Sequence, residues 1–125
     1  MSRLLAHVSL QASDMTASRH FYETVLAPLG AVVVLEVDGA IGFGREGVPE
    51  FWIGDATDPP GREAHVAFTA PDRAAVRAFH AAAVGLGFES LHAPRLFPEY
   101  TESYYGAFVR DPDGNNVEAV CFAPE

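Results

Sequence analysis

The sequence contains no lysine and only one cysteine, Cys121, among its 125 residues. One cysteine excludes an intrachain disulfide and a metal site built on a pair of cysteines. No apolar run approaches the roughly 20 residues that cross a bilayer, and the N-terminus has no signal-peptide pattern. We therefore expect a cytoplasmic protein whose fold depends on neither a disulfide nor a membrane.

Positive charge is also scarce. The eight lysine and arginine positions are all arginine, and seventeen acidic residues give a net charge of −9. This balance argues against nucleic acid or an anionic membrane as a partner, and it weakly favours a neutral or cationic small molecule. A chain of this length, with 49% hydrophobic residues, is expected to form one domain with its own core.

The chain contains an internal repeat. The segments "HVSLQASDMTASRHFYETVL", from His7, and "HVAFTAPDRAAVRAFHAAAV", from His65, agree at seven of twenty positions without a gap. Each copy begins with an alternating strand, continues with a helix that starts near Asp14 or Asp72, and is followed by three shorter strands. The repeat predicts a duplicated structural unit.

The expected fold is α+β, with two βαβββ modules related by pseudo-twofold symmetry and with sheets curled around a shared cleft. Residues 1–125 form one domain in this interpretation, with module 1 at about 1–58 and module 2 at about 62–125. The segment Pro59-Pro60-Gly61 joins the modules. The short strands are expected in "AVVVLEV", "AIGFG" and "EFWIG", and in "FESLHA", "YYGAFVR" and "NNVEAVCF".

Glu118 lies in the middle of an apolar strand, and a buried carboxylate needs a partner. Side chains alternate along a strand, and duplication places His7 and His65 symmetrically. We therefore predict a divalent metal ion bound by His7, His65 and Glu118, with open positions for water or substrate. The alternative is that both histidines are ordinary core or rim residues and that Glu118 pairs with Arg110 or with backbone amides.

Other candidates surround this predicted centre. Tyr104 is the aromatic residue most suited to a polar role, because a buried phenol usually needs a hydrogen-bond partner. Further aromatic residues are expected either to line the substrate cavity or to pack in the core; they are Phe43, Trp52, Phe97, Tyr100 and Phe108. Asp111 and Asp113 in "DPDG" are interpreted as parts of a hairpin turn.

The chain resembles the vicinal oxygen chelate superfamily, which includes glyoxalases, extradiol dioxygenases, fosfomycin-resistance proteins and bleomycin-resistance proteins. The resemblance rests on "HVSL", "FYETVLAPLG", "HVAF", "AFHAAAVGLG" and above all "RDPDGNNVE". It implies metal ligands on the first and last strands of each module, at His7, His65, Glu118 and the position of Trp52 or its neighbour. An indole cannot bind a metal, so this chain departs from the four-ligand pattern of glyoxalase I.

The resemblance implies a metal-dependent lyase, transferase or dioxygenase with a zinc, manganese, iron, nickel or cobalt ion as Lewis acid. Ser9 lies where fosfomycin-modifying enzymes keep a hydroxyl group, and Ser9 or Tyr104 is expected to orient substrate or relay a proton. The absence of lysine makes fosfomycin itself an unexpected substrate. A homodimer is also expected. The alternatives are a non-catalytic drug-binding protein of the bleomycin-resistance type and a degenerate enzyme.

Overall fold

A computed structural model of the chain describes residues 5–56 and 63–123. The first module contains β1 (Val8–Ala12), α1 (Met15–Leu26), the short 3-10 helix η1 (Ala27–Leu29), β2 (Val32–Val37), β3 (Ala40–Arg45) and β4 (Val48–Asp55). The second contains β5 (His65–Thr69), α2 (Arg73–Gly85), β6 (Ser90–Leu96), β7 (Tyr105–Arg110) and β8 (Asn116–Cys121). The predicted joint Pro59-Pro60-Gly61 lies outside the described residues.

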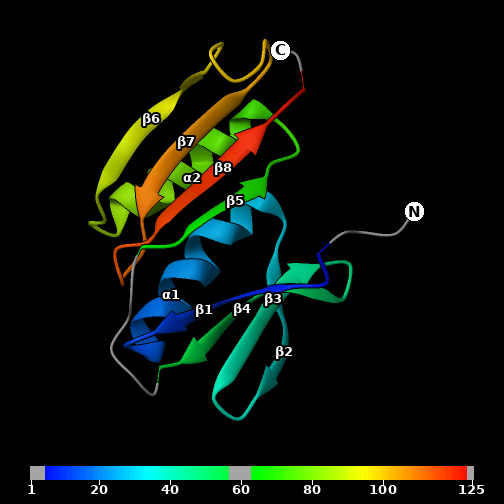
Figure 1. Ribbon diagram of the computed structural model, residues 1–125, viewed down its shortest axis with the longest axis vertical. Helices are drawn as coiled ribbons and strands as arrows, with labels where there is room; N and C mark the ends of the chain where they lie inside the picture. Colours follow the sequence, from blue (N-terminus) through cyan, green and yellow to red (C-terminus); the bar gives the residue numbers. More distant parts are fainter. Residues whose placement is uncertain (1–4, 57–62, 124–125) are drawn as a thin grey trace.

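Each module forms its own four-stranded sheet (Figure 1). The strand orders are β1-β4-β3-β2 and β5-β8-β7-β6. In both sheets the first and last strands of the module pair in parallel, and the other neighbours are antiparallel. The prediction of an α+β fold with two βαβββ modules is therefore confirmed.

Both helices begin where the sequence indicates. The Asp14 side chain accepts a hydrogen bond from the backbone N–H of Ala17 at 3.0 Å, and Asp72 accepts one from that of Ala75 at 2.8 Å. Each aspartate thus satisfies one of the N–H groups that have no partner inside the helix. The two modules use the same local signal at equivalent positions.

The hydrophobic core lies where the helices cover one face of each sheet. Its aromatic members include Phe21 and Tyr22 of α1, Phe43 of β3, Phe51 of β4 and Phe79 of α2. The helices contact each other as well as the sheets, so the core is continuous between the modules. Each sheet consequently has a second face that the helices do not cover, called here its open face.

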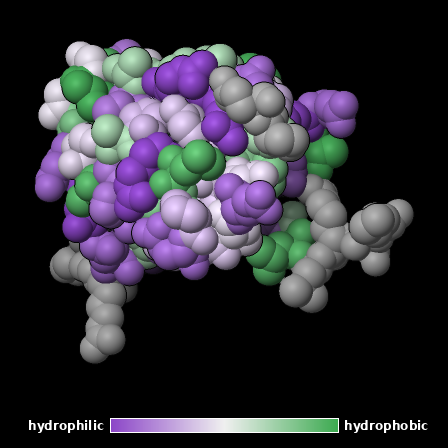
Figure 2. All heavy atoms as spheres, turned by 90° about the horizontal axis from the view of Figure 1, so that it is seen from above, coloured by the Kyte–Doolittle hydropathy of each residue, from purple (hydrophilic) through white to green (hydrophobic). Residues whose placement is uncertain are grey.

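Figure 2 shows that one side of the molecule is largely hydrophilic, with small and separate hydrophobic patches. This surface agrees with the large excess of acidic residues in the sequence. Among the described residues, no helix is long and apolar enough to cross a membrane.

Candidate functional site

The buried carboxylate of Glu118 has two partners on the open face of the second sheet. Glu118 is 2% exposed and lies on β8. Its Oε1 is 2.8 Å from Nε2 of His65, and its Oε2 accepts a hydrogen bond from the Tyr104 hydroxyl group. The His65 side chain remains 49% exposed, so solvent or a ligand can reach the pair from one side.

The parallel pairing of β5 with β8 brings this pair together. In the register, His65 is opposite Asn116 and Ala67 is opposite Glu118, so the imidazole and the carboxylate lie diagonally on one face. β5 and β8 are far apart in the sequence, but their parallel pairing places the imidazole of His65 beside the carboxylate of Glu118. The metal hypothesis required Glu118 and His65 to share a face, and the structure places them on one.

Gly106, which was not among the residues predicted for the site, provides the space for Tyr104. A Cβ atom at Gly106 would lie 3.2 Å from the Tyr104 ring and 3.6 Å from Oε2 of Glu118. A side chain there would push against the phenol that contacts the carboxylate. A glycine near the start of a strand, two residues after Tyr104, is the sequence feature that could have indicated this close approach.

A group of aromatic rings begins at Phe108, the cross-strand neighbour of Glu118 on β7. The Phe108 ring lies 5.9 Å from the His65 ring, centroid to centroid, and 5.3 Å from Phe97. Tyr100 stacks on Phe97 but is 58% exposed. The outer edge of the group, at Tyr100, is thus exposed to solvent.

Burial raises the pKa of Tyr104 well above that of a free phenol, and the hydrogen bond to Glu118 raises it further. Burial also raises the pKa of Tyr22, followed by the charge of Asp111 and a hydrogen bond to it. In both cases the neutral phenol is favoured because it donates to a carboxylate and because the phenolate would be poorly solvated. Tyr104 therefore keeps its proton and donates a hydrogen bond to Glu118.

We expect two of the four tyrosines, Tyr22 and Tyr104, to stay protonated past pH ~10, where a free phenol ionises. A folded pKa above the unfolded one gives stability that is complete below pH ~10 and is lost as the pH rises towards the folded value. Ultraviolet titration of the wild type and of Tyr104→Phe tests this, since the variant should lose one late-titrating phenol. Four phenols that titrate together near pH ~10 would contradict it.

The residues predicted on the first module lie on the other sheet. His7 is exposed just before β1, and its ring centroid is 6.4 Å from that of Trp52. Ser9 is opposite Trp52 in the β1–β4 register, as Ala67 is opposite Glu118 in the second sheet. Trp52 is thus the structural equivalent of Glu118, and the first module has an indole where the second has a carboxylate.

Among residues 5–56 and 63–123, no group of three or more His, Cys, Asp or Glu side chains could hold a metal ion. One chain therefore joins His65 to Glu118 but does not bring His7 to them. Phe43 is also away from this pair, because it is buried in the core beside Tyr22 and Phe51.

The His65–Glu118 pair nevertheless fits part of a metal centre. An imidazole nitrogen and a carboxylate oxygen are donors suited to zinc and related divalent ions. Tyr104 already holds the second oxygen of Glu118, as outer-shell groups do around metal ligands. In addition, Asn116 Oδ1 is buried with no hydrogen-bond partner in the described part of the chain, and Asn116 is the strand neighbour of His65.

A cavity of about 250 Å³ lies between the modules, on the side of the core. Apolar residues of both modules line it, among them Leu29, Phe51 and Phe68, and His7 and Arg45 also border it. Arg45 Nε donates to the Leu29 carbonyl at 2.8 Å, and its Nη2 donates to the Thr69 carbonyl. Arg45 thus connects β3 of the first module to the end of β5.

Comparisons with known proteins agree with this architecture. The family model for the Glyoxalase/Bleomycin resistance protein/Dioxygenase superfamily matches residues 4–119. A glyoxalase/bleomycin resistance protein from Albidiferax ferrireducens is 26% identical, with a TM-score of 0.82, and covers 98% of this chain and 100% of its own. Comparison with curated proteins gives no significant match.

Two more distant structures share the fold. A lactoylglutathione lyase from Agrobacterium tumefaciens is 24% identical, with a TM-score of 0.70, and the alignment covers 97% of this chain and 94% of that one. A genomically encoded fosfomycin resistance protein from Listeria monocytogenes is 17% identical, with a TM-score of 0.70 and coverage of 98% and 96%. With the family model matching nearly the whole chain, the protein belongs to the Glyoxalase/Bleomycin resistance protein/Dioxygenase superfamily.

Proposed function

We propose that the protein is a divalent-metal-dependent enzyme that acts on a small molecule through an oxygen atom of that molecule. The observation that carries the proposal is the contact of 2.8 Å between His65 Nε2 and Glu118 Oε1 beside a group of aromatic rings. A buried carboxylate beside an accessible imidazole is a costly arrangement for stability alone. In a metal centre the bound cation would offset the cost of burying the carboxylate.

His65 and Glu118 would hold the ion, which supplies Lewis acidity towards the substrate oxygen. Tyr104 keeps Glu118 in one orientation by donating to its second oxygen. Asn116 Oδ1 is the spare acceptor next to His65, suited to the ring N–H that faces away from the ion. The aromatic rings beside Glu118 would exclude water and bind the apolar part of the substrate, and the Tyr104 hydroxyl group is the nearest hydrogen-bond donor.

The third ligand in this proposal is His7 from a second copy of the chain. It is supported by the exposure of His7 on the open face of the first sheet and by its separation from His65 and Glu118 within one chain. Two copies related by a twofold axis could place the open face of one first module against that of the other second module. Each dimer would then contain two equivalent centres, with Ser9 and Trp52 facing the substrate.

Complementation between two inactive variants tests this arrangement. His7→Ala and Glu118→Ala should each bind little Zn²⁺ alone, because each lacks one ligand in every site. After the two are unfolded and refolded together, about half of the dimers are mixed and one of the two sites in each is intact. Zn²⁺ titration should then recover about a quarter of the wild-type sites.

Three results separate the parts of the proposal. No recovery on mixing, or light scattering that shows only single chains, would contradict the shared site. Wild-type protein that binds Zn²⁺, Mn²⁺, Fe²⁺, Co²⁺ and Ni²⁺ no better than His65→Ala would contradict the metal centre itself. Recovery with the same metal affinity as the wild type supports both.

A second candidate is sequestration of a cationic drug without catalysis. The net charge of −9 and the exposed ring of Tyr100 beside the buried carboxylate favour it. Calorimetry with bleomycin distinguishes the two functions, using metal-free wild type and the His65→Ala variant. Tight binding that needs neither metal nor His65 would favour sequestration.

A further inference from the structure

We propose that the loop Asp111–Asn115 is a clamp that positions the His65–Glu118 pair, with Asp111 and Asn115 as its positioning residues. The proposal rests on the function proposed above, because it concerns the same pair. The sequence had suggested only a hairpin turn for this segment. Its hydrogen bonds reach two other parts of the chain, and this extension is what indicates a further role.

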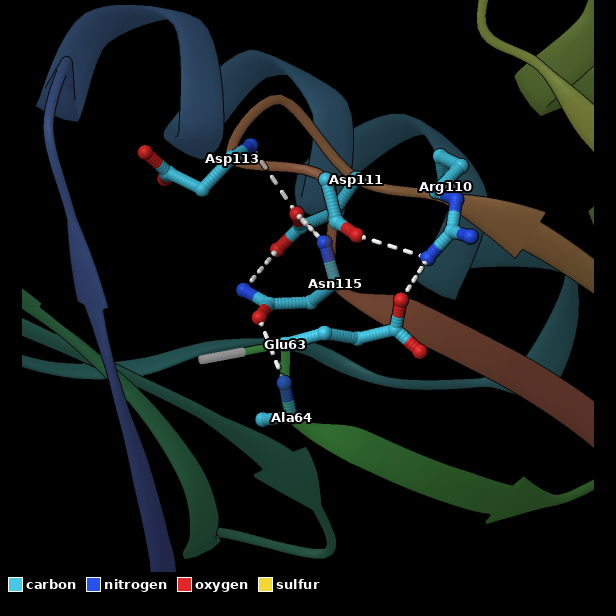
Figure 3. A network of polar contacts seen from close by, with 7 residues as sticks. Glu63, Ala64, Arg110, Asp111, Asp113 and Asn115 are labelled. Carbon is cyan, nitrogen blue, oxygen red and sulfur yellow. Dashed lines mark hydrogen bonds and ion pairs between the residues drawn. The ribbon is translucent and has the colours of Figure 1, made fainter. Parts of the chain in front are cut away.

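Asp111 gathers four hydrogen bonds while only 4% exposed. Its Oδ1 accepts from the backbone N–H groups of Asp113 and Asn115, at 2.9 and 2.8 Å. Its Oδ2 accepts from the Asn115 side-chain amide at 3.1 Å and from the Tyr22 hydroxyl group at 2.6 Å. Figure 3 shows the bonds of Asp111 to Asp113 and Asn115. The carboxylate therefore fixes both the shape of the loop and the orientation of the Asn115 side chain.

Asn115 connects the loop to the start of β5. Its Oδ1 accepts a hydrogen bond of 2.9 Å from the backbone N–H of Ala64, the residue immediately before His65 (Figure 3). The Ala64 carbonyl in turn accepts one of 2.9 Å from the backbone N–H of Asn116. A side chain at the start of β8 thus holds the backbone at the start of β5.

Arg110 supports the same junction from the end of β7. Its Nη1 donates to the Gly114 carbonyl at 2.9 Å and also contacts the Glu63 carboxylate (Figure 3). The contact with Glu63 is partly exposed and screened by solvent, so we assign it a smaller role than the buried bonds of Asp111 and Asn115.

The register between β5 and β8 has to be fixed by contacts of this kind. The strands of a hairpin are aligned by their turn, whereas parallel strands joined through a long connection are not. A slip of one residue would move Glu118 from the open face into the core, or His65 out of reach of it. The observed pairing begins at His65 opposite Asn116, directly beside the Asn115–Ala64 bond. The clamp therefore sets the register at its first pair.

The clamp is also tied to the first module. Besides Tyr22 of α1, which donates to Asp111, the backbone N–H of Ser13 lies 3.2 Å from Oδ1 of Asp113, and its hydroxyl group contacts the same carboxylate. Ser13 does not contact β5 or β8 through these bonds. The chain consequently offers a matched control that weakens the loop without touching the register.

The test measures the Zn²⁺ dissociation constant of folded protein by competition with a chromophoric chelator. Asn115→Ala should weaken Zn²⁺ binding by about 10-fold or more, as removal of outer-shell support does in metal proteins. Ser13→Ala should leave the dissociation constant within about twofold of the wild type. Val109→Ala is the control for lost stability. It creates a cavity on the core face of β7, so it should lower the melting temperature without changing Zn²⁺ affinity.

The outcomes separate this proposal from the proposed function. Wild type and Asn115→Ala with equal affinities would overturn the clamp, even if the variant melts earlier. An equal loss of affinity in Val109→Ala would overturn it too, since general destabilisation would then explain the effect. Failure of the wild type to bind Zn²⁺ more tightly than His65→Ala would instead refute the metal centre on which the clamp acts.

Discussion

With Zn²⁺ the wild-type protein is expected to melt at a higher temperature, and replacing Glu118 with alanine is expected to abolish that increase. The variant deletes the anionic ligand of the proposed centre and leaves His65 with a neutral neighbour. Removal of a group that hydrogen-bonds a metal ligand lowers metal affinity by about 10- to 100-fold. Loss of a direct ligand should therefore lower it by at least about 100-fold. Thermal melts at several Zn²⁺ concentrations measure this, because stabilisation follows RT ln(1 + [L]/Kd).

Glu118→Gln and Glu118→Asp serve as graded controls. Both keep an oxygen near His65, so they should lose less affinity than Glu118→Ala. In the absence of metal, the three variants are not expected to rank in stability as they rank in Zn²⁺ affinity. Glu118→Gln removes a buried charge but keeps an acceptor for the Tyr104 hydroxyl group. A Zn²⁺-dependent increase that survives in Glu118→Ala would contradict the role of this residue as a ligand.

The second large effect is expected from Gly44→Ala, which should destabilise the fold by about 3 kcal/mol or more. A Cβ atom at Gly44 would lie 1.7 Å from the carbonyl oxygen of Val48 and 2.8 Å from its carbonyl carbon. Both are backbone atoms, so no side-chain rotation can relieve the overlap. Equilibrium unfolding in urea measures the change in the free energy of unfolding.

Gly85→Ala is the matched control, since Gly85 is the last residue of α2 and a Cβ there meets no atom within 4 Å. It should be neutral or stabilising by up to about 1 kcal/mol. If Gly44→Ala were as stable as Gly85→Ala, the irregularity in pairing between Phe43 and Gly44 would not be a tight constraint on the β3–β4 hairpin.

The order of the elements could be predicted from the sequence because the repeat gives it twice. Alternation, which is a local property of strands, separated the faces of β5 and of β8, and the need of a buried carboxylate for a partner suggested that Glu118 shares a face with His65. Glu118 was expected to need a partner, and the structure supplies His65 and Tyr104 rather than Arg110, which contacts Glu63. These features could be predicted because they depend on the alternation of side chains along a strand and on the burial of apolar segments. Both can be recognised in short stretches of sequence.

The remaining features depend on how separate elements meet. Alternation fixes which face His7 occupies, but it does not say where the first sheet lies relative to the second. "DPDG" was explained sufficiently by a turn, so the hydrogen bond from Tyr22 of α1 to Asp111 gave no local signal. The bond from Asn115 to the backbone beside His65 was hidden in the same way, because it joins residues 51 positions apart.

The difference between the indole of Trp52 and the carboxylate at the equivalent position of the second module has a consequence for how the protein can change over time. In an assembly of identical single modules, every mutation would appear on both halves of a site at once. Here the two halves are encoded separately, so Trp52 and Ser9 can vary while His65 and Glu118 stay as they are. Under the proposed function, the surface around Trp52 and the surface that carries Glu118 would therefore be able to change independently of each other.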